Sequence, residues 1–191
     1  MLKAIYGIYS NKPQIALNAL LNSKAHKKRF TNPVLNERWE IIEAYLSFLG
    51  RTGKIAYPNK FRFSKLNNTL KSNNRTEAQK ANVLVLELLF LLVNNKIDAF
   101  TKRTWQIERV IAKNFNKRPF RRTKYFLRSL RCVVDGNYHP AGAARHAERH
   151  LSKMRAIKET IDLNLLDKEV IPYEMLWGEV IRILSKKINL K

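Results

Sequence analysis

Hydrophobic residues recur along almost the whole chain three and four positions apart, which is the spacing of an amphipathic helix. We find no convincing segment in which apolar and polar residues alternate as in a half-buried strand. The pattern predicts helices over residues 2–10, 13–24, 34–50, 59–71, 76–94, 98–115, 120–135, 141–156 and 172–187. The longest apolar run, at 83–93, contains Glu87 and is shorter than the ~20 residues that a membrane span needs. It predicts a central, buried helix in an all-α fold.

Tight breaks between the predicted helices recur at nearly equal spacing. Asn11, Gly53, Asn95 and Gly136 follow one another at intervals of 42, 42 and 41 residues. Asn and Gly are the residues that most easily end a helix in a left-handed conformation. A repeat of this length predicts helix–turn–helix units that each bury an apolar face against the next unit. We therefore expect a right-handed α-solenoid of about four units, with a period of about 42 residues and a C-terminal capping helix.

The segment GNYHPAGAARHAERHL, at 136–151, resembles the turn and second helix of a tetratricopeptide-like repeat. Gly136, Tyr138 and Ala141 occupy the matching positions. The period is longer than the 34 residues of that family, and in the predicted first helices only Trp39 resembles the usual pattern. The resemblance implies a tetratricopeptide-like or HEAT-like α-solenoid without identifying one family.

The charge pattern divides the chain into two parts of one domain. Residues 1–157 form the predicted array of helical hairpins, whereas 158–191 contain six basic and six acidic residues and form the predicted capping segment. Its last helix starts near Pro172 and has an apolar face made by Tyr173, Leu176, Val180, Ile183 and Leu184. The first unit has only about ten residues before its turn, as expected of a short cap or of the tail of a longer protein.

The chain is strongly basic, with 37 Lys and Arg against 15 Asp and Glu and a net charge of +22. Such an excess predicts a polyanionic partner, which is either nucleic acid or an acidic protein of a larger assembly. Residues 101–131 hold eleven of the basic residues and one acid, Glu108. A second basic segment lies at 24–30. The candidate nucleic-acid contacts are Arg103, Arg109, Lys113, Lys117, Arg118, Arg121, Arg122, Lys124, Arg128, Arg131, Arg145, Arg149 and Lys153.

A basic run on a helix is by itself most often a solvated face, so the prediction depends on the recurrence of such runs in successive units. Four cations at 121, 124, 128 and 131 share one helix face, which favours contact with phosphates. We find no aromatic RNP strand or GXXG loop, so binding by shape and charge is expected rather than base readout. The aromatic residues that could stack on bases are interpreted as core, and these are Tyr57, Phe61, Phe63, Trp105, Tyr125 and Phe126.

The stretch AARHAERHLSKMR, at 143–155, allows three interpretations. Arg145 and His150 form an R-H-x-x-x-H pattern that resembles the motif of HEPN ribonucleases, which would make the arginine a phosphate ligand and the histidine an acid or base. His146 and His150 have the spacing of two metal ligands, with His139 or Cys132 as a third. The third interpretation, a basic helix with an apolar stripe at 144, 147, 151 and 154, needs no chemistry and is the one we favour.

No other catalytic pattern is present: the chain has no Gly-rich phosphate loop, GxSxG or HExxH motif. We therefore expect a non-enzymatic protein with no cofactor, no small-molecule substrate and no membrane segment. The N-terminus has no secretory pattern, and the single cysteine excludes an internal disulfide framework. Both features predict a cytoplasmic protein.

Overall fold

The computed structural model of the 191-residue chain describes all residues except 26–32, 59–60, 62–75, 116–119, 158–168 and 189–191. Every regular element among the described residues is an α-helix, which confirms the all-α prediction. The helices are α1 (Leu2–Tyr9), α2 (Pro13–Ala25), α3 (Pro33–Arg51), α5 (Glu77–Val93), α6 (Ile97–Trp105), α7 (Ile107–Asn114), α8 (Arg121–Asp135), α9 (Pro140–Arg155) and α11 (Tyr173–Ile188).

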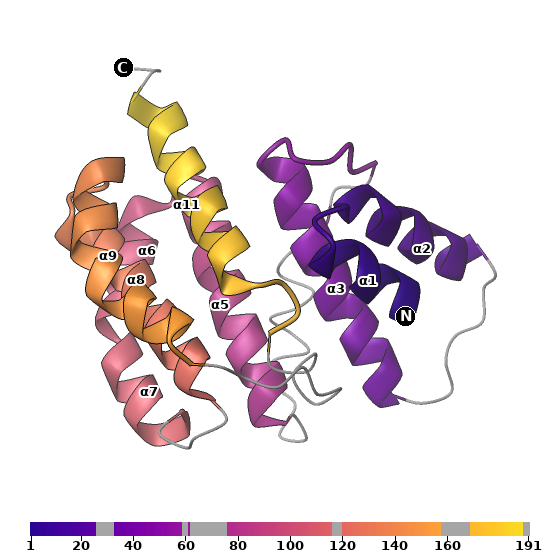
Figure 1. Ribbon diagram of the computed structural model, residues 1–191, viewed down its shortest axis with the longest axis horizontal. Helices are drawn as coiled ribbons and strands as arrows, with labels where there is room; N and C mark the ends of the chain where they lie inside the picture. The colour runs from indigo at the N-terminus through magenta and orange to yellow at the C-terminus, as the bar shows by residue number, and fades with distance from the viewer. Residues whose placement is uncertain (26–32, 59–60, 62–75, 116–119, 158–168, 189–191) are drawn as a thin grey trace.

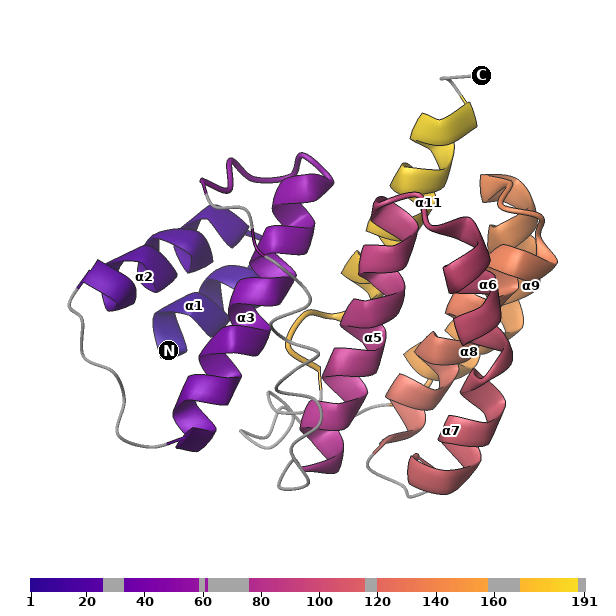
Figure 2. The same ribbon diagram turned by 180° about the vertical axis from the view of Figure 1, so that it is seen from behind.

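Helices that follow one another in the chain pack against one another. The pairs α1–α2, α2–α3, α3–α5, α5–α6 and α8–α9 are all in contact. Helices α1 to α3 form one side of the molecule, helices α6 to α9 form the other, and α5 and α11 lie between them (Figures 1 and 2). This arrangement brings the helices α6, α7, α8 and α9, which carry most of the described basic residues between 101 and 155, to the same side.

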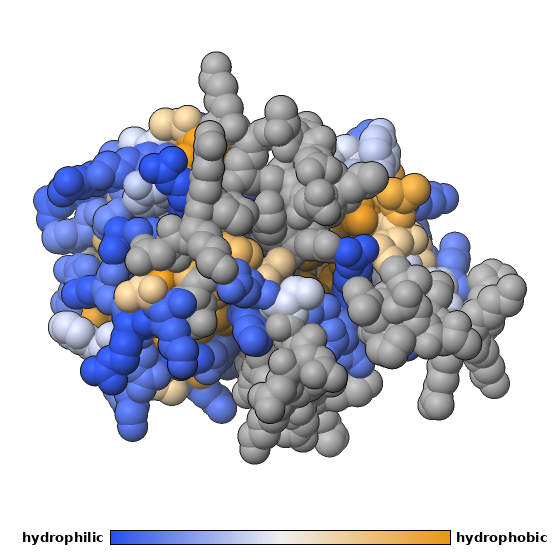
Figure 3. Space-filling model, turned by 90° about the horizontal axis from the view of Figure 1, so that it is seen from below, coloured by the Kyte–Doolittle hydropathy of each residue, from blue (hydrophilic) through white to orange (hydrophobic). Residues whose placement is uncertain are grey.

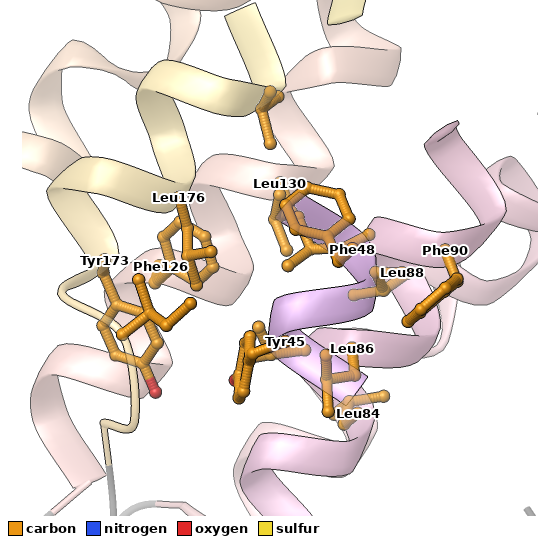
Figure 4. Packing of buried hydrophobic residues seen from close by; sticks show 14 of the residues in the cluster. Tyr45, Phe48, Leu84, Leu86, Leu88, Phe90, Phe126, Leu130, Tyr173 and Leu176 are labelled. Atoms are coloured by element: carbon orange, nitrogen blue, oxygen red, sulfur yellow. The ribbon is translucent and has the colours of Figure 1, made fainter. Parts of the chain in front are cut away.

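The core is continuous from α3 to α11 and is centred on α5. Helix α5 is buried around most of its circumference, as its long apolar run predicts. The rings of Phe126 and Tyr173 stack with their centroids 4.4 Å apart. Tyr45 Oη donates to Asn82 Oδ1 at 3.0 Å, so the two polar groups buried in this core satisfy each other. Figure 4 shows the core side chains Tyr45, Phe48, Leu84, Leu86, Leu88, Phe90, Phe126, Leu130, Tyr173 and Leu176.

The C-terminal helix α11 is central rather than terminal in space. All five residues of its predicted apolar face are buried. It packs against both α5 and α9, and Glu179 on it lies 3.7 Å from Lys54 Nζ in the turn after α3. Lys186 Nζ donates to the carbonyl of Thr52 in the same turn. In an ideal solenoid each unit contacts only its neighbours, so α11 adds a connection that the repeat pattern does not predict.

Four interhelical turns have the same hydrogen-bonding pattern. Asn11, Gly53, Asn95 and Asn137 have φ angles of 54°, 79°, 59° and 50°. In each turn the N–H of the next residue donates to the carbonyl five positions earlier at 2.8–2.9 Å, as in a Schellman motif. The left-handed residue is the predicted one in the first three turns, whereas in the fourth turn Asn137 and Tyr138, with φ 59°, are left-handed and Gly136 is not. Asn11, Gly53, Asn95 and Asn137 are 42 positions apart in every case.

Gly136 is required for a different reason. It has φ −85°, which any residue can adopt. A Cβ atom at this position would lie 2.3 Å from the backbone nitrogen of Ala143 on α9. Glycine therefore allows the end of α8 and the start of α9 to approach closely, which fixes the position of α9 against α8.

The predicted helix over 98–115 is divided in two at Gln106, although the segment contains no glycine or proline. Thr101 Oγ1 donates to the carbonyl of Ile97, and Thr104 Oγ1 donates to that of Thr101. Threonine hydroxyls that bond back to the preceding turn bend helices, and the Gln106 N–H follows with a bond to Arg103 three positions earlier. The predicted helix over 59–71 falls mostly outside the described residues, and Phe61 within it is buried but not helical.

Candidate nucleic-acid interface

Helices α7 and α8 are joined by a two-point ion pair between Arg128 and Glu108. Arg128 Nε and Nη2 donate to the two carboxylate oxygens at 2.9 and 2.7 Å. The hydrogen bonds from Arg128 lower the pKa of Glu108, burial opposes this shift, and attraction to Arg128, Arg131 and Lys124 strengthens it. One carboxylate is therefore surrounded by three cations of α8.

Helix α9 adds two further cations and a histidine next to this pair. The half-buried imidazole of His150 stacks on the ring of Tyr125 from α8, with centroids 6.5 Å apart. Among the described residues its Nδ1 atom is buried without a hydrogen-bond partner. Burial lowers the pKa of His150, and three nearby cations lower it further, with only Glu108 opposing; these cations are Arg128, Arg149 and Lys153.

These electrostatic contacts bring together five cations, which we call the α7–α9 basic cluster: Lys124, Arg128 and Arg131 from α8 and Arg149 and Lys153 from α9. The spacing along α8 places its three members on one face, as the sequence predicts. The two members on α9 are exposed. Hydrophilic residues cover the end of the molecule that carries α7, α8 and α9, at the left of Figure 3. Three of its members, Lys124, Arg128 and Arg131, attract the carboxylate of Glu108, whereas Arg128, Arg149 and Lys153 lie near His150.

Arg122 differs from the other predicted contacts because its charge is already neutralised. Its side chain is 15% exposed, and its guanidinium donates to both oxygens of the buried Glu169 at 2.8 and 3.0 Å. It also donates to Glu174 at 2.9 Å and to the carbonyl of Met154 at 3.1 Å. Through these bonds Arg122 connects α8 to α9 and to the carboxylates before and within α11. The structure thus gives this predicted nucleic-acid contact a role in the packing of the helices, and the prediction that it contacts nucleic acid stays a prediction.

Trp105 does not lie in the core, so the prediction that placed it there is wrong. It is 63% exposed at the junction between α6 and α7. The guanidinium carbon of Arg131 lies 5.3 Å from the centroid of its ring. Of the other aromatic residues interpreted as core, Phe61 and Phe126 are buried, Tyr57 and Tyr125 are half-buried, and Phe63 lies outside the described residues.

The remaining predicted contacts fall into three groups. Arg103 is half-buried and pairs with Glu87 on α5 at 2.9 Å. Lys117, Arg118 and the side chains of the basic segment 24–30 lie outside the part of the chain that the structure describes. Exposed positions on α7, α8 and α9 are held by Arg109, Lys113, Arg121 and Arg145.

The stretch 143–155 forms the basic helix with an apolar back that the sequence favours. The buried positions of α9 are Ala143, Ala147, Leu151 and Met154, so the stripe begins at Ala143 rather than at Ala144. Arg145 is exposed to solvent. The cations that lower the pKa of His150 are Arg128, Arg149 and Lys153, and Arg145 is not one of them. His146 is exposed, and among the described residues no three His, Cys, Asp or Glu side chains are placed to hold a metal ion.

Comparison of the chain with models of protein families, with curated proteins and with solved structures finds no match in any of the three. Among the helices described above, none combines the length and apolar character needed to cross a bilayer.

Proposed function

We propose that the protein is a non-enzymatic helical scaffold that binds the phosphate backbone of nucleic acid through the α7–α9 basic cluster. The observation that carries the proposal is the gathering of cations from two helices: Lys124, Arg128 and Arg131 lie near Glu108, and Arg128, Arg149 and Lys153 lie near His150. Such a concentration of like charge destabilises an isolated helix and is stabilised when a polyanion neutralises it. Each phosphate that pairs with a Lys or Arg also releases a condensed counterion, which favours binding at low salt.

We further propose that the helices form a tetratricopeptide-like or HEAT-like right-handed solenoid of helix–turn–helix units with α11 as its cap. The four Schellman turns at intervals of 42 residues support a repeated unit, because each requires the same helix end in the same register. The contacts of α11 with α5 and α9 support its role as a cover for the apolar side of the array. This arrangement would present successive hairpins side by side to an extended ligand.

The test is the binding of labelled single- and double-stranded RNA and DNA over a series of salt concentrations. We expect log K to fall linearly with log salt, with a slope of about −0.7 to −0.9 for each phosphate contact. The double variant Arg149→Glu/Lys153→Glu should lower the affinity at least about tenfold and reduce the slope by about two contacts. Its matched control, Lys3→Glu/Lys12→Glu, changes the net charge equally at exposed positions of the opposite side of the molecule.

The outcomes separate the proposed function from its alternatives. An equal loss in both double variants would mean that the net charge, and not the cluster, determines binding. The absence of binding near physiological salt would favour an acidic protein partner of a larger assembly. Cleaved RNA on a denaturing gel, lost in His150→Ala, would instead identify a HEPN-type ribonuclease that uses Arg145 and His150.

A further inference from the structure

Trp105 is an exposed aromatic residue that the proposed backbone binding does not use. Its side chain is 63% exposed, whereas the other two tryptophans, Trp39 and Trp177, are 8% and 7% exposed. Burying an indole is strongly favourable because it removes about 150–250 Å² from water. An indole kept at the surface, at the bend that separates α6 from α7, is therefore available to a ligand.

The indole is connected to the α7–α9 basic cluster through Arg131. The guanidinium of Arg131 lies over the ring at 5.3 Å from its centroid and belongs to the same helix face as Lys124 and Arg128. A cation over an indole is attracted by the electron-rich face of the ring. A flat aromatic surface thus borders the positively charged face of α8.

We propose that the nucleic acid bound by this protein is a single strand and that one of its bases stacks on Trp105. This inference rests on the proposed function. A single strand exposes the faces of its bases, whereas a duplex keeps them stacked inside and offers an indole only their edges. Stacking on aromatic side chains beside a positively charged groove is the way in which proteins bind single strands without reading their sequence. The half-buried ring of Tyr125, already covered by His150, leaves Trp105 as the stacking surface of the cluster.

The experiment compares a 12-nucleotide oligothymidylate with a duplex of the same length, using tryptophan fluorescence and anisotropy. Because Trp39 and Trp177 are buried, quenching by a stacked base reports on Trp105. We expect the single strand to quench the emission and the duplex to leave it nearly unchanged. Trp105→Ala should weaken single-strand binding by about 5- to 150-fold, with duplex affinity changed less than about twofold. Trp105→Phe should retain part of the affinity, since a phenyl ring still stacks.

Tyr6→Ala serves as the matched control because it removes another 63% exposed aromatic residue, located on α1. Unchanged single-strand affinity in Trp105→Ala would overturn the inference and leave the proposed function standing. An equal loss of affinity for single strand and duplex in this variant would have the same meaning. A wild-type protein that binds neither at physiological salt would overturn both. If the far-ultraviolet circular dichroism shows that Trp105→Ala changes the fold, the fluorescence of the wild-type protein tests the inference instead. Equal tryptophan emission with bound single strand and with bound duplex would contradict stacking on Trp105.

Discussion

Replacing Arg122 tests whether this arginine stabilises the fold or binds a ligand. Arg122→Met keeps an unbranched side chain about as long as the aliphatic part of the arginine and removes the guanidinium, which leaves the carboxylate of Glu169 without its cation. Because the Glu169 side chain is only 6% exposed, the loss should approach the lower end of the range for a broken buried ion pair, about 3 kcal/mol. Glu174 is 40% exposed, so its part of the interaction contributes under ~1 kcal/mol. For a chain of this size the melting temperature should fall by about 6–12 °C.

Two further variants isolate the cause. Arg122→Met/Glu169→Gln removes both charges, and the amide oxygen can still accept the N–H of Tyr173, which now bonds to Glu169 at 2.7 Å. This double variant should recover most of the lost stability in urea denaturation, to within about 1 kcal/mol of the wild type. Glu174→Gln, on the exposed side of the same arginine, should change the stability by about 0.5 kcal/mol or less.

The pH dependence supplies a second measurement of the same effect. Burial raises the pKa of Glu169, and Arg122 opposes this shift. Without the arginine the pKa should rise further. A carboxyl whose folded pKa lies above its unfolded value favours the folded state at low pH, and this contribution is lost as the pH rises. The deficit of Arg122→Met should therefore be smaller at pH ~4 than at pH ~7. A single variant as stable as the wild type, or a double variant less stable than the single one, would refute the reasoning.

Three other predictions follow from local contacts. Gly136→Ala should cost at least about 2 kcal/mol in thermal unfolding, because its Cβ would meet the backbone of α9. Gly178 is an exposed position of α11 with no other part of the protein within 4 Å of its Cβ, so Gly178→Ala should stabilise the protein by about 0.5–1 kcal/mol. Equal effects of the two substitutions would contradict the close approach at Gly136. Burial raises the pKa of the Cys132 thiol to about 11. Iodoacetamide should therefore alkylate this cysteine slowly at pH ~8 until denaturant is added. Rapid labelling of the folded protein would contradict the burial of the thiol. A bound phosphate should raise the pKa of His150, which the protein lowers, so the affinity for nucleic acid should rise as the pH falls from about 7.5 to 5.5. His150→Gln should remove this rise in affinity. A pH response that persists in the variant would assign the effect to another group.

The helices were predictable because the apolar spacing and the turn residues agree. Helix α5 was evident from its apolar run, and Asn11, Gly53 and Asn95 were evident as turn residues because few other side chains tolerate a left-handed backbone. In the fourth turn glycine and asparagine are adjacent, and either could have been the left-handed residue. The division between α6 and α7 was not predictable from helix periodicity, because it follows from threonine hydroxyls that bond within a sequence of good helical pattern.

The site was only partly predictable, because a basic side chain in the sequence carries no record of its partner. Arg121 and Arg122 are adjacent and chemically identical, yet the turn of about 100° per residue directs the first to solvent and the second toward α11. The carboxylate that neutralises Arg122 lies 47 positions later in the chain. The pattern of basic residues can therefore predict the existence of a charged surface, but its composition depends on long-range ion pairs.

Some cations on this side of the molecule hold the fold together, and others lie around the proposed ligand site. Glu87 and the Glu169–Glu174 pair bind Arg103 and Arg122 along the edges of α5 and α11, where the ion pairs connect neighbouring helices. Glu108 accepts hydrogen bonds from Nε and Nη2 of Arg128 and is also attracted by Arg131 and Lys124. Arg128, Arg149 and Lys153 lie near the half-buried His150, while the indole of Trp105 lies exposed beside Arg131. A ligand that matches this surface carries regularly spaced negative charges, which pair with the cations, and flat aromatic groups, which stack on the indole. A single-stranded nucleic acid has this combination.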